Sequence, residues 1–292
     1  MTHVAICVAT FGRPDMLRAC LTSIIESVAR VTRYRATIIV VDNHEVAVVA
    51  PVLSALAGAH DLEFVMCHEP RAGIPFARNK ALSEALARRA DFIAFIDDDE
   101  LVDREWFDQI MSAVDQDGID VVSGTVFLKG DRLIAKYPKR PVERDRAETD
   151  NVVFRSWLAR ALQFDESLAH CGGSDNLFFR QAYELGARIR TCEQAIVTED
   201  LPPERRTAKW RVRRQWRYGI VSTMIERRLR RGRKPTQIFL LGISQMPLGV
   251  AQWLVELTLG REFGMRGLDR VVRGAGMLAG LVGVRYDEYQ RG

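Results

Sequence analysis

Cysteine is scarce in this sequence and is not arranged in pairs. The chain has five cysteines, an odd number, scattered at Cys7, Cys20, Cys67, Cys171 and Cys192 and never in a C-x-x-C spacing. Neither a disulfide framework nor a zinc site is therefore indicated. A reducing cytoplasm is the expected environment.

Two other sequence signals are also missing. No G-x-G-x-x-G follows any predicted strand, since Gly12 stands alone in residues 10–14, so hydride transfer loses its main support. The first apolar stretch, residues 4–9, has no basic region before it and is too short for a signal peptide. We expect it to be a first strand.

The composition that remains is that of a globular protein. The 292 residues are 47% hydrophobic and 27% charged, which is enough to bury a sizeable core. Strands are predicted over residues 4–9, 36–41, 62–67, 92–96 and 119–128, and helices over residues 14–28, 46–56, 72–90, 157–162 and 177–185. Their alternation predicts an α/β fold with a doubly wound, mostly parallel sheet over roughly the first 125 residues. Residues 129–150, rich in charge and containing two prolines, are expected to be a loop.

The strand predicted over residues 92–96 stops abruptly at three consecutive acids, Asp97, Asp98 and Asp99. Ligands of open α/β sheets bind at the carboxyl ends of strands, and closely packed carboxylates repel unless a cation lies between them. Mg²⁺ or Mn²⁺, held by one or two carboxylates and the oxygens of a diphosphate, is the natural candidate. The alternative is a polar turn whose acids cap the next helix.

A second candidate is Asp175, which follows Gly172, Gly173 and Ser174. The two glycines allow a sharp turn, so Asp175 is expected near a helix N-terminus that faces a cleft. Capping of that helix by Ser174 or Asp175 explains the same residues without catalysis.

Five stretches together resemble family 2 glycosyltransferases, which have the GT-A fold. They are VAICVATFGRPDMLRACLTSI from residue 4, VVDN at 40–43, RAGIPFARNKAL at 71–82, FIDDDE at 95–100 and FDESLAHCGGSDNLFFRQAYELGARI at 164–189. Their order and spacing match the family over roughly residues 1–200. The resemblance implies a GT-A catalytic domain, expected over residues 1–204, and a nucleotide-diphospho-sugar donor.

The resemblance also implies roles for individual residues. Thr10 and Asp42 would contact the nucleotide base and ribose, and Asp98 the ribose. The segment with Arg71, Arg78 and Asn79 would line the same pocket. Asp97 and Asp99 would hold the metal, Asp99 being the better ligand. Asp175 would be the base that deprotonates the acceptor hydroxyl, in a single displacement that inverts the anomeric carbon.

Two departures from the family pattern concern the site. Ser174 stands where the family often has an acid, and Glu199 lies near where it often has a metal-binding histidine, so the third metal ligand is open. The Q-x-x-R-W signature of processive members is missing, because Gln215, Trp216 and Arg217 have the wrong arrangement. A single-addition transferase is therefore expected.

The tail, residues 205–292, is expected to be a separate helical region. Residues 205–234 hold thirteen Lys or Arg and a single acid, Glu226, and residues 237–260 are strongly apolar. This order is typical of a protein peripherally bound to an anionic membrane, here the inner face of the cell membrane. Gln245, Gln252 and Glu256 on one helical face, with Pro247 interrupting the middle, favour an interfacial or protein-packed helix over a span.

Residues 271–284 contain four glycines and could form a hairpin with the first apolar stretch. The alternative is that both helices complete the core or form an oligomer interface. Nucleic-acid binding is not favoured, because no RNA-binding motif accompanies the basic residues.

These observations predict an inverting, metal-dependent transferase that moves one sugar to a hydroxyl acceptor, such as a lipid-linked glycan in surface or exopolysaccharide assembly. Two alternatives stay open. One is a nucleotidyl- or phosphotransferase that uses the same aspartates, and the other is a non-catalytic binder of sugar nucleotides or nucleic acid.

Overall fold

The structure is a computed structural model that describes residues 1–57, 62–130, 133–136, 143–258 and 265–287. It divides into two compact units. The first unit comprises Met1–Ala169 and Ser174–Asp200, and the second comprises His170–Gly173 and Leu201–Gly292. The short segment before Ser174 therefore belongs to the second unit.

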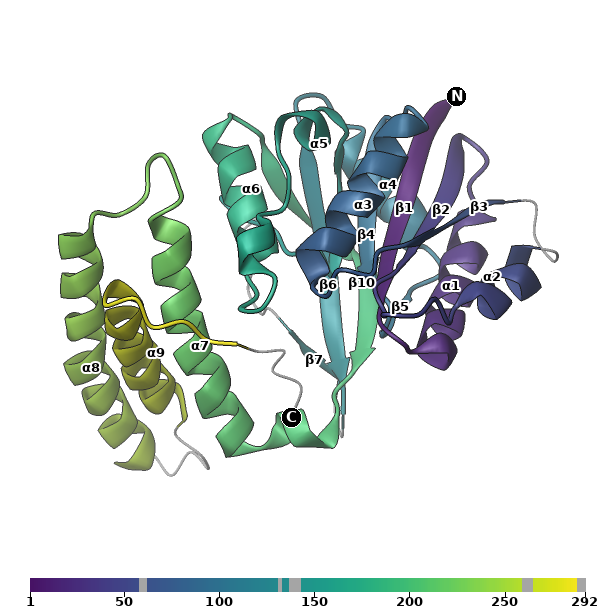
Figure 1. The fold of residues 1–292 in the computed structure, drawn as a ribbon. Coiled ribbons are helices and arrows are strands. Elements are labelled where there is room, and N and C mark those ends of the chain that lie inside the picture. The colour runs from purple at the N-terminus through teal and green to yellow at the C-terminus, as the bar shows by residue number, and fades with distance from the viewer. Residues whose placement is uncertain (58–61, 131–132, 137–142, 259–264, 288–292) are drawn as a thin grey trace. The chain divides into compact units, whose positions relative to one another are not determined.

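The first unit is an α/β structure built on one mixed sheet (Figure 1). Its strands are β1 (Thr2–Thr10), β2 (Tyr34–Asp42), β3 (Glu63–His68), β4 (Phe92–Asp97), β5 (Glu100–Val102), β6 (Val121–Lys129), β7 (Leu133–Ala135), β8 (Glu143–Arg144), β9 (Asn151–Arg155) and β10 (Ile189–Asp200). Its helices are α1 (Pro14–Val28), α2 (Ala50–Ala57), α3 (Ile74–Ala87), α4 (Trp106–Val114), α5 (Trp157–Ala161) and α6 (Ser174–Glu184), with a 3₁₀ turn η1 (Glu166–Leu168).

The strand order is β3-β2-β1-β4-β9-β6-β10-β5, with β7 paired to β6 and β8 to β10. The longer pairings, β3 with β2, β2 with β1, β1 with β4 and β6 with β10, are all parallel. Strand β9 runs antiparallel between β4 and β6, and β5 runs antiparallel to β10. The predicted α/β class with a mostly parallel sheet is confirmed, and the antiparallel strands are additions to it.

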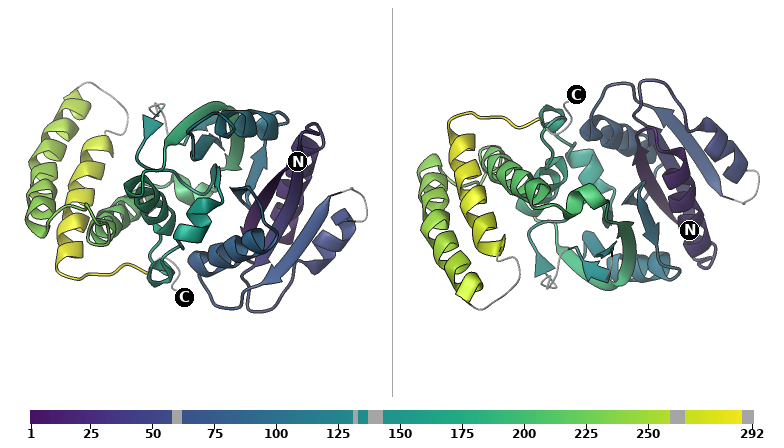
Figure 2. Two further views of the ribbon diagram at one scale, coloured as in Figure 1. Left: turned by 90° about the horizontal axis from the view of Figure 1, so that it is seen from above. Right: turned by 90° about the horizontal axis from the view of Figure 1, so that it is seen from below.

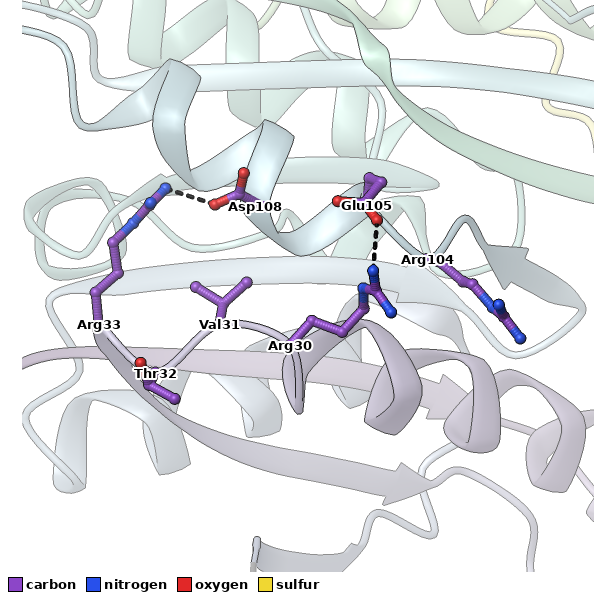
Figure 3. Close-up of a pocket in the computed structure, with 7 residues that line it drawn as sticks. All are labelled: Arg30, Val31, Thr32, Arg33, Arg104, Glu105 and Asp108. Atoms are coloured by element: carbon purple, nitrogen blue, oxygen red, sulfur yellow. Dashed lines mark ion pairs between the residues drawn. The ribbon is translucent and has the colours of Figure 1, made fainter.

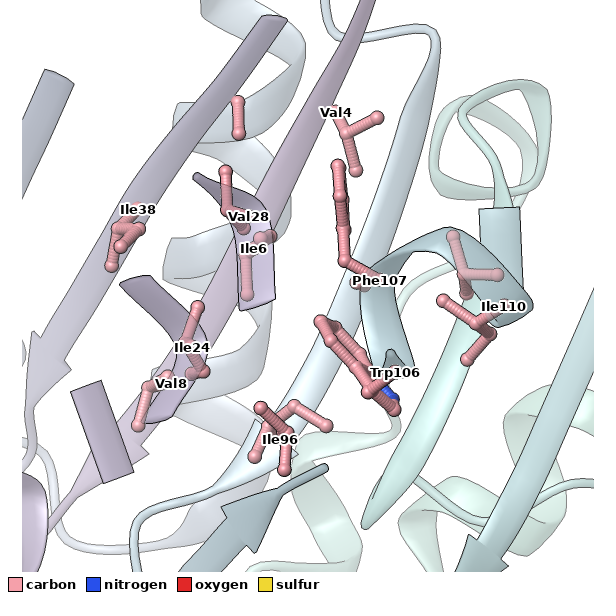
Figure 4. Close-up of a cluster of buried hydrophobic side chains, with 14 of the residues drawn as sticks. Val4, Ile6, Val8, Ile24, Val28, Ile38, Ile96, Trp106, Phe107 and Ile110 are labelled. Atoms are coloured by element: carbon pink, nitrogen blue, oxygen red, sulfur yellow. The ribbon is translucent and has the colours of Figure 1, made fainter. Parts of the chain in front are cut away.

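Helices cover both faces of this sheet, as a doubly wound fold requires. Alternate residues of each strand point to opposite faces, so Ile6 of β1 packs with α1, α2 and α4, whereas Cys7 packs with α3, α5 and α6. Trp106 and Phe107, both fully buried, begin α4 and fill the first of these layers together with strand side chains (Figure 4).

The strand register places the candidate acids at one edge. Thr10, the last residue of β1, pairs with Asp42 of β2, and its neighbour Ala9 pairs with Asp97 of β4. Because these strands are parallel, their carboxyl ends meet, and Thr10, Asp42 and Asp97 lie on the same rim of the sheet.

Two expectations about local structure in the first unit need correction, and one of its strands is unexpected. Residues 46–49 are not helical, since α2 begins at Ala50; the carboxylate of Asp42 binds the backbone N–H groups of Val48 and Val49 instead. The stretch 129–150, expected to be a loop, contains strands β7 and β8, and its residues 131–132 and 137–142 lie outside the described ranges. Strand β10 is not among the strands expected from the sequence, because its polar sequence lacks a long apolar run.

The second unit is helical. It contains a 3₁₀ turn η2 (Pro203–Arg206) and the helices α7 (Ala208–Glu226), α8 (Pro235–Thr258) and α9 (Met265–Leu281). Helix α9 lies between α7 and α8 (Figures 1 and 2). Pro247 does not interrupt α8, which runs through it as one helix of 24 residues. By length and composition α8 is able to cross a membrane.

Candidate active site

The three consecutive acids form a tight connection between two strands. Asp97 ends β4, and Asp98 and Asp99 make the two-residue turn to β5. Asp98 is almost completely buried, and its carboxylate accepts a hydrogen bond of 2.6 Å from the hydroxyl of Thr10. The guanidinium of Arg13 contacts both turn acids, at 2.8 Å from Asp98 and 3.2 Å from Asp99. The ends of β1 and β4 are thereby joined through side chains.

Asp97 is the most exposed of the three acids. Its side chain is 40% exposed, and the buried Glu100 lies behind it. Partial burial raises the pKa of Asp97 to about 7, against the opposing effect of Arg78, 3.5 Å away. Asp99 adds to the rise by like-charge repulsion. The positive charge around Asp97 is thus too small to offset the cost of burying its ionised carboxylate.

A buried charge network lies behind Asp97. The fully buried Glu100 accepts a hydrogen bond of 3.0 Å from the backbone N–H of Asp97, while its other oxygen has no hydrogen-bond partner among the described residues. Burial raises the pKa of Glu100 well above its ordinary value.

Lys136 supplies the positive charge of this network. Its ammonium lies 2.6 Å from the carboxylate of Glu199 and 3.0 Å from that of Asp150. Burial alone would lower the pKa of Lys136, but the acids around it, including Glu100, raise it above its ordinary value. Glu199, the residue considered as a third metal ligand, is therefore bound to an internal ammonium.

The residues expected to contact the nucleotide have structural partners of their own. Asp42 is fully buried, and its two carboxylate oxygens accept hydrogen bonds from the backbone N–H groups of His44, Val48 and Val49. This arrangement fixes the loop after β2 at the rim. A contact between Asp42 and the nucleotide stays a prediction.

Arg71 and Asn79 organise the neighbouring segment. Arg71 binds the carboxylate of Glu69 through two nitrogens, at 2.9 and 2.8 Å, and its guanidinium lies 4.5 Å from the ring centre of Phe76. Asn79 both donates to and accepts from the backbone of Phe164, at 2.9 and 2.8 Å. Asn79 therefore fixes the chain before η1, and Arg71, with a 57% exposed side chain, is the more available of the two to a ligand.

Asp175 stands in the first turn of α6, as expected. It is half-buried, and its carboxylate accepts a hydrogen bond from the backbone N–H of Asn176 at 2.8 Å. No hydrogen bond or ion pair joins it to residues 97–99 within the described ranges. The preceding Gly172 and Gly173 have positive φ angles of +75° and +84°, which glycine adopts without strain.

The aspartate run fits a divalent metal whose remaining ligands come from a substrate. Within the described part of the chain, no group of three or more His, Cys, Asp or Glu side chains is arranged as a complete metal site. Mg²⁺ or Mn²⁺ nevertheless needs only one or two protein carboxylates when a diphosphate supplies further oxygen ligands. The two carboxylates must lie close together, and a shortage of positive charge around one of them favours binding of a cation. Asp97 and Asp99 have that character.

A separate polar pocket of about 390 Å³ lies elsewhere in the first unit. It is lined by residues 30–33, ahead of β2, and by the start of α4, and Arg30–Glu105 and Arg33–Asp108 ion pairs cross it (Figure 3). Strand β2 begins at Tyr34, directly after the pocket residues, and ends eight residues later at Asp42, roughly 26 Å away at the rise of a strand. This pocket is therefore not part of the rim that carries the acids.

Comparison with known proteins decides the family. The model of glycosyl transferase family 2 matches residues 5–185, which contain the whole rim described above. The chain belongs to this family. The transferase is 26% identical to the succinoglycan biosynthesis protein ExoM of Rhizobium meliloti (strain 1021), over 97% of this chain and 94% of that protein.

Solved structures show the same fold at low sequence identity. The mannosyltransferase PcManGT from Pyrobaculum calidifontis, in complex with GDP-Man and Mn²⁺, matches with a TM-score of 0.63 and 17% identity over 95% of this chain and 86% of its own. S. aureus TarS 1–349, in complex with UDP, matches with a TM-score of 0.57 and 17% identity over 98% and 93%. The GT-A fold expected for this glycosyltransferase is thus confirmed.

Sequence reasoning missed three residues that organise the rim. Arg13 lies inside the TFGRPD stretch, but its pairing with Asp98 and Asp99 depends on β1 and β4 being neighbours. Lys136 and Glu100 meet only because β5, β6 and β10 assemble in the sheet. The sequence signal for Glu100 was its position directly after three acids.

Proposed function

We propose that this glycosyltransferase moves one sugar from a nucleotide-diphospho-sugar to a hydroxyl of a glycan acceptor, with inversion of the anomeric carbon and with a bound divalent metal. The observation that carries the proposal is the pair Asp97 and Asp99 on the rim, of which Asp97 has a raised pKa and little compensating charge. A nucleotidyl- or phosphotransferase could use the same acids, but the family assignment favours glycosyl transfer.

The residues of the rim have different proposed roles. Asp97 and Asp99 would hold Mg²⁺ or Mn²⁺, which when bound would stabilise the negative charge of the departing diphosphate. Support for a divalent metal comes from PcManGT, a protein of the same fold solved with Mn²⁺. Thr10 and Arg13 hold the turn acids in place, so that the carboxylates keep their positions when a donor enters.

Donor contacts are proposed for Asp42, which ends β2, for Asp98, which follows β4, and for Arg71, Arg78 and Asn79, which lie between β3 and the second turn of α3. Arg78 is the better placed of the two arginines for a diphosphate bound to the metal, because its guanidinium lies 3.5 Å from Asp97. Arg71 presents an exposed guanidinium for a phosphate or ribose oxygen.

The proposed chemistry is one displacement. The carboxylate of Asp175 accepts the proton of the acceptor hydroxyl, the hydroxyl oxygen bonds to the anomeric carbon, and the bond from that carbon to the diphosphate oxygen breaks with its electron pair leaving on the diphosphate. Attack on the face opposite the leaving group inverts the configuration.

The acceptor is proposed to be a lipid-linked glycan at the cytoplasmic face of a membrane. Support comes from the relative ExoM, a succinoglycan biosynthesis protein, and from the basic helix α7 with the apolar helix α8 after it. About 1 kcal/mol per well-placed Lys or Arg is the usual attraction to an anionic surface.

The test is donor binding and slow hydrolysis across UDP-, GDP- and dTDP-sugars with Mn²⁺. One donor should bind and release free sugar and nucleoside diphosphate, and Asp99→Asn should lose both activities. Asp175→Asn should keep donor binding but lose transfer to the acceptor by about 10²–10⁴-fold, the usual contribution of a general base. Asp108→Asn, in the pocket of Figure 3, is the matched control and should behave as wild type. Metal-independent binding that Asp99→Asn leaves untouched would exclude the proposed site.

A further inference from the structure

Helix α8 has the opposite polarity to a helix on the surface of a soluble protein. The polar side chains of its middle and last turns, Gln245, Gln252 and Glu256, face its neighbour α9, whereas most of its large apolar side chains face outward. The exposed apolar residues, between 42% and 66% exposed, are Phe239, Leu240, Ile243, Leu248, Val250, Trp253, Leu254, Val255 and Leu257. Such a face is unstable in water and needs an apolar cover.

The polar residues of α8 are satisfied within the hairpin. Arg270 of α9 donates to Gln245 at 3.0 Å and to Gln252 at 3.2 Å, and Gln252 donates to Glu256 at 2.9 Å. The hydroxyl of Ser244 binds the backbone carbonyl of Leu241. This internal satisfaction is what a bilayer demands, because its hydrocarbon offers no hydrogen-bond partners.

Close backbone contact holds the two helices together without large side chains. A Cβ on Gly249 would lie 2.6 Å from the carbonyl oxygen of Gly267, and a Cβ on Gly274 would lie 2.6 Å from that of Gly242. Small residues at the crossing let the two backbones approach closely, so that α9 covers one side of α8 and leaves the apolar side of α8 outward.

The charged residues just before α8 indicate what covers its outward apolar face. Residues 227–234 hold six Lys or Arg, whereas residues 235–255 have no charged side chain. A second copy of the chain would bring the same positive segment to the interface, and helix-to-helix contact would cover only one stripe of the outward face. An anionic bilayer offers both a negatively charged surface and hydrocarbon.

We propose that α8 lies parallel to the surface of an anionic membrane with its apolar face in the acyl-chain layer. Residues 227–234 then lie at the headgroups, and α9 lies on the polar side of α8. Arg266 and Arg273 of α9 are exposed, so α9 is suited to the interface and not to the hydrocarbon. This inference rests on the membrane association proposed above and makes its mode specific: apolar insertion, beyond attraction by charge.

Flotation of the full chain with vesicles tests the mode of binding. Wild type should float with phosphatidylcholine vesicles that contain phosphatidylglycerol and should stay bound when salt is raised afterwards. Leu240→Glu and Leu254→Glu on the outward face should each lower the partition coefficient by about tenfold or more. Leu185→Glu, at an equally exposed leucine after α6, should float as wild type.

A second readout reports depth. Tryptophan fluorescence should be quenched by lipids brominated along their acyl chains, and Trp253→Phe should remove most of that quenching. Complete release by salt, or flotation of Leu254→Glu equal to wild type, would overturn insertion. A dimer in lipid-free solution that Leu254→Glu dissociates, with no flotation of wild type, would assign the face to a second copy.

Donor hydrolysis in the same preparations keeps the two proposals separate. Leu240→Glu and Leu254→Glu should retain metal-dependent release of nucleoside diphosphate. Wild type that floats without hydrolysing any donor would contradict the proposed function and leave the insertion standing, whereas wild type that hydrolyses a donor but does not float would overturn the insertion alone.

Discussion

Thr10 and Asp98 join the first strand to the aspartate turn through a hydrogen bond of 2.6 Å, with both side chains out of contact with solvent. Their separation in sequence is 88 residues, and the parallel pairing of β1 with β4 brings them together. Burial raises the pKa of Asp98, while Arg13 and Thr10 oppose the rise. The hydroxyl of Thr10 therefore supports the charged form of this carboxylate.

Replacing Thr10 tests that support. Thr10→Val keeps the shape of the side chain but leaves one Asp98 oxygen without its buried donor, so we expect a loss of about 1–3 kcal/mol in the free energy of unfolding. Thr10→Ser keeps the hydroxyl and should lose less. Urea denaturation measures both variants, and equal stability of Thr10→Val and wild type would show that the hydrogen bond contributes nothing net.

Metal removal gives the second prediction. Chelation by EDTA should abolish donor hydrolysis, and added Mn²⁺ should restore it in wild type. Asp99→Asn should regain no hydrolysis even at Mn²⁺ concentrations about tenfold above those that saturate wild type, because one of the two protein ligands loses its charge. The measurement is a Mn²⁺ titration of hydrolysis at saturating donor.

Its control is Asp103→Asn, an acid just beyond the turn that caps the backbone of Glu105. This variant should have the Mn²⁺ affinity of wild type. An Asp99→Asn protein with an unchanged titration curve would remove Asp99 from the metal site.

The sequence predicted the first half of the sheet well for a physical reason. Strands β1, β2 and β4 are buried on both faces, so they read as continuous apolar runs, and each is followed by a recognisable polar end. Parallel pairing then places Asp42 and Asp97 on one rim without further information. The family stretches added roles that periodicity alone could not assign.

The second half of the site depends on contacts that no local pattern reveals. Lys136 follows a three-residue strand, and Glu199 lies in the polar strand β10, so neither has an apolar signal around it. Their pairing arises from sheet neighbours far apart in sequence. For the same reason Glu199 looked available to a metal, whereas in the structure an ammonium binds it.

The third prediction concerns Lys136, which neutralises a cluster of buried acids. Lys136→Met would leave Glu199 and Asp150 in a buried site without their cation, and we expect a loss of about 3–5 kcal/mol in the free energy of unfolding at neutral pH. Without Lys136 the two buried carboxylates have no cation beside them, which destabilises the folded state only while they are charged. The deficit should therefore be small at acid pH, where the acids are protonated in both states, and should grow as pH rises.

Urea denaturation from acid to neutral pH checks this dependence. The double variant Lys136→Met/Glu199→Gln should recover part of the stability at neutral pH, because one uncompensated charge is gone. A deficit that is the same at every pH would show that Lys136 acts by packing and not by charge.

The final prediction concerns the turn before Asp175. Gly173 has a φ of +84°, and a Cβ there would lie 2.4 Å from Cγ1 of Val221 in α7; Gly186 has a φ of +97° and open space around it. Both Gly→Ala changes incur backbone strain of roughly 1 kcal/mol, but only Gly173→Ala adds a steric clash, typically about 1–3 kcal/mol. Gly173→Ala should thus be the less stable variant.

The same pair separates a stability effect from a catalytic one. Because Ser174 and Asp175 follow Gly173 directly, a displaced turn should also move the proposed base, so kcat for sugar transfer should fall in Gly173→Ala while donor KM changes little. Gly186→Ala should keep kcat. Adding Val221→Ala to Gly173→Ala removes the methyl group that clashes. Recovery of kcat in that double variant would show that the contact with Val221 causes the loss. If kcat does not recover, the loss is due to the backbone φ angle of Gly173 itself.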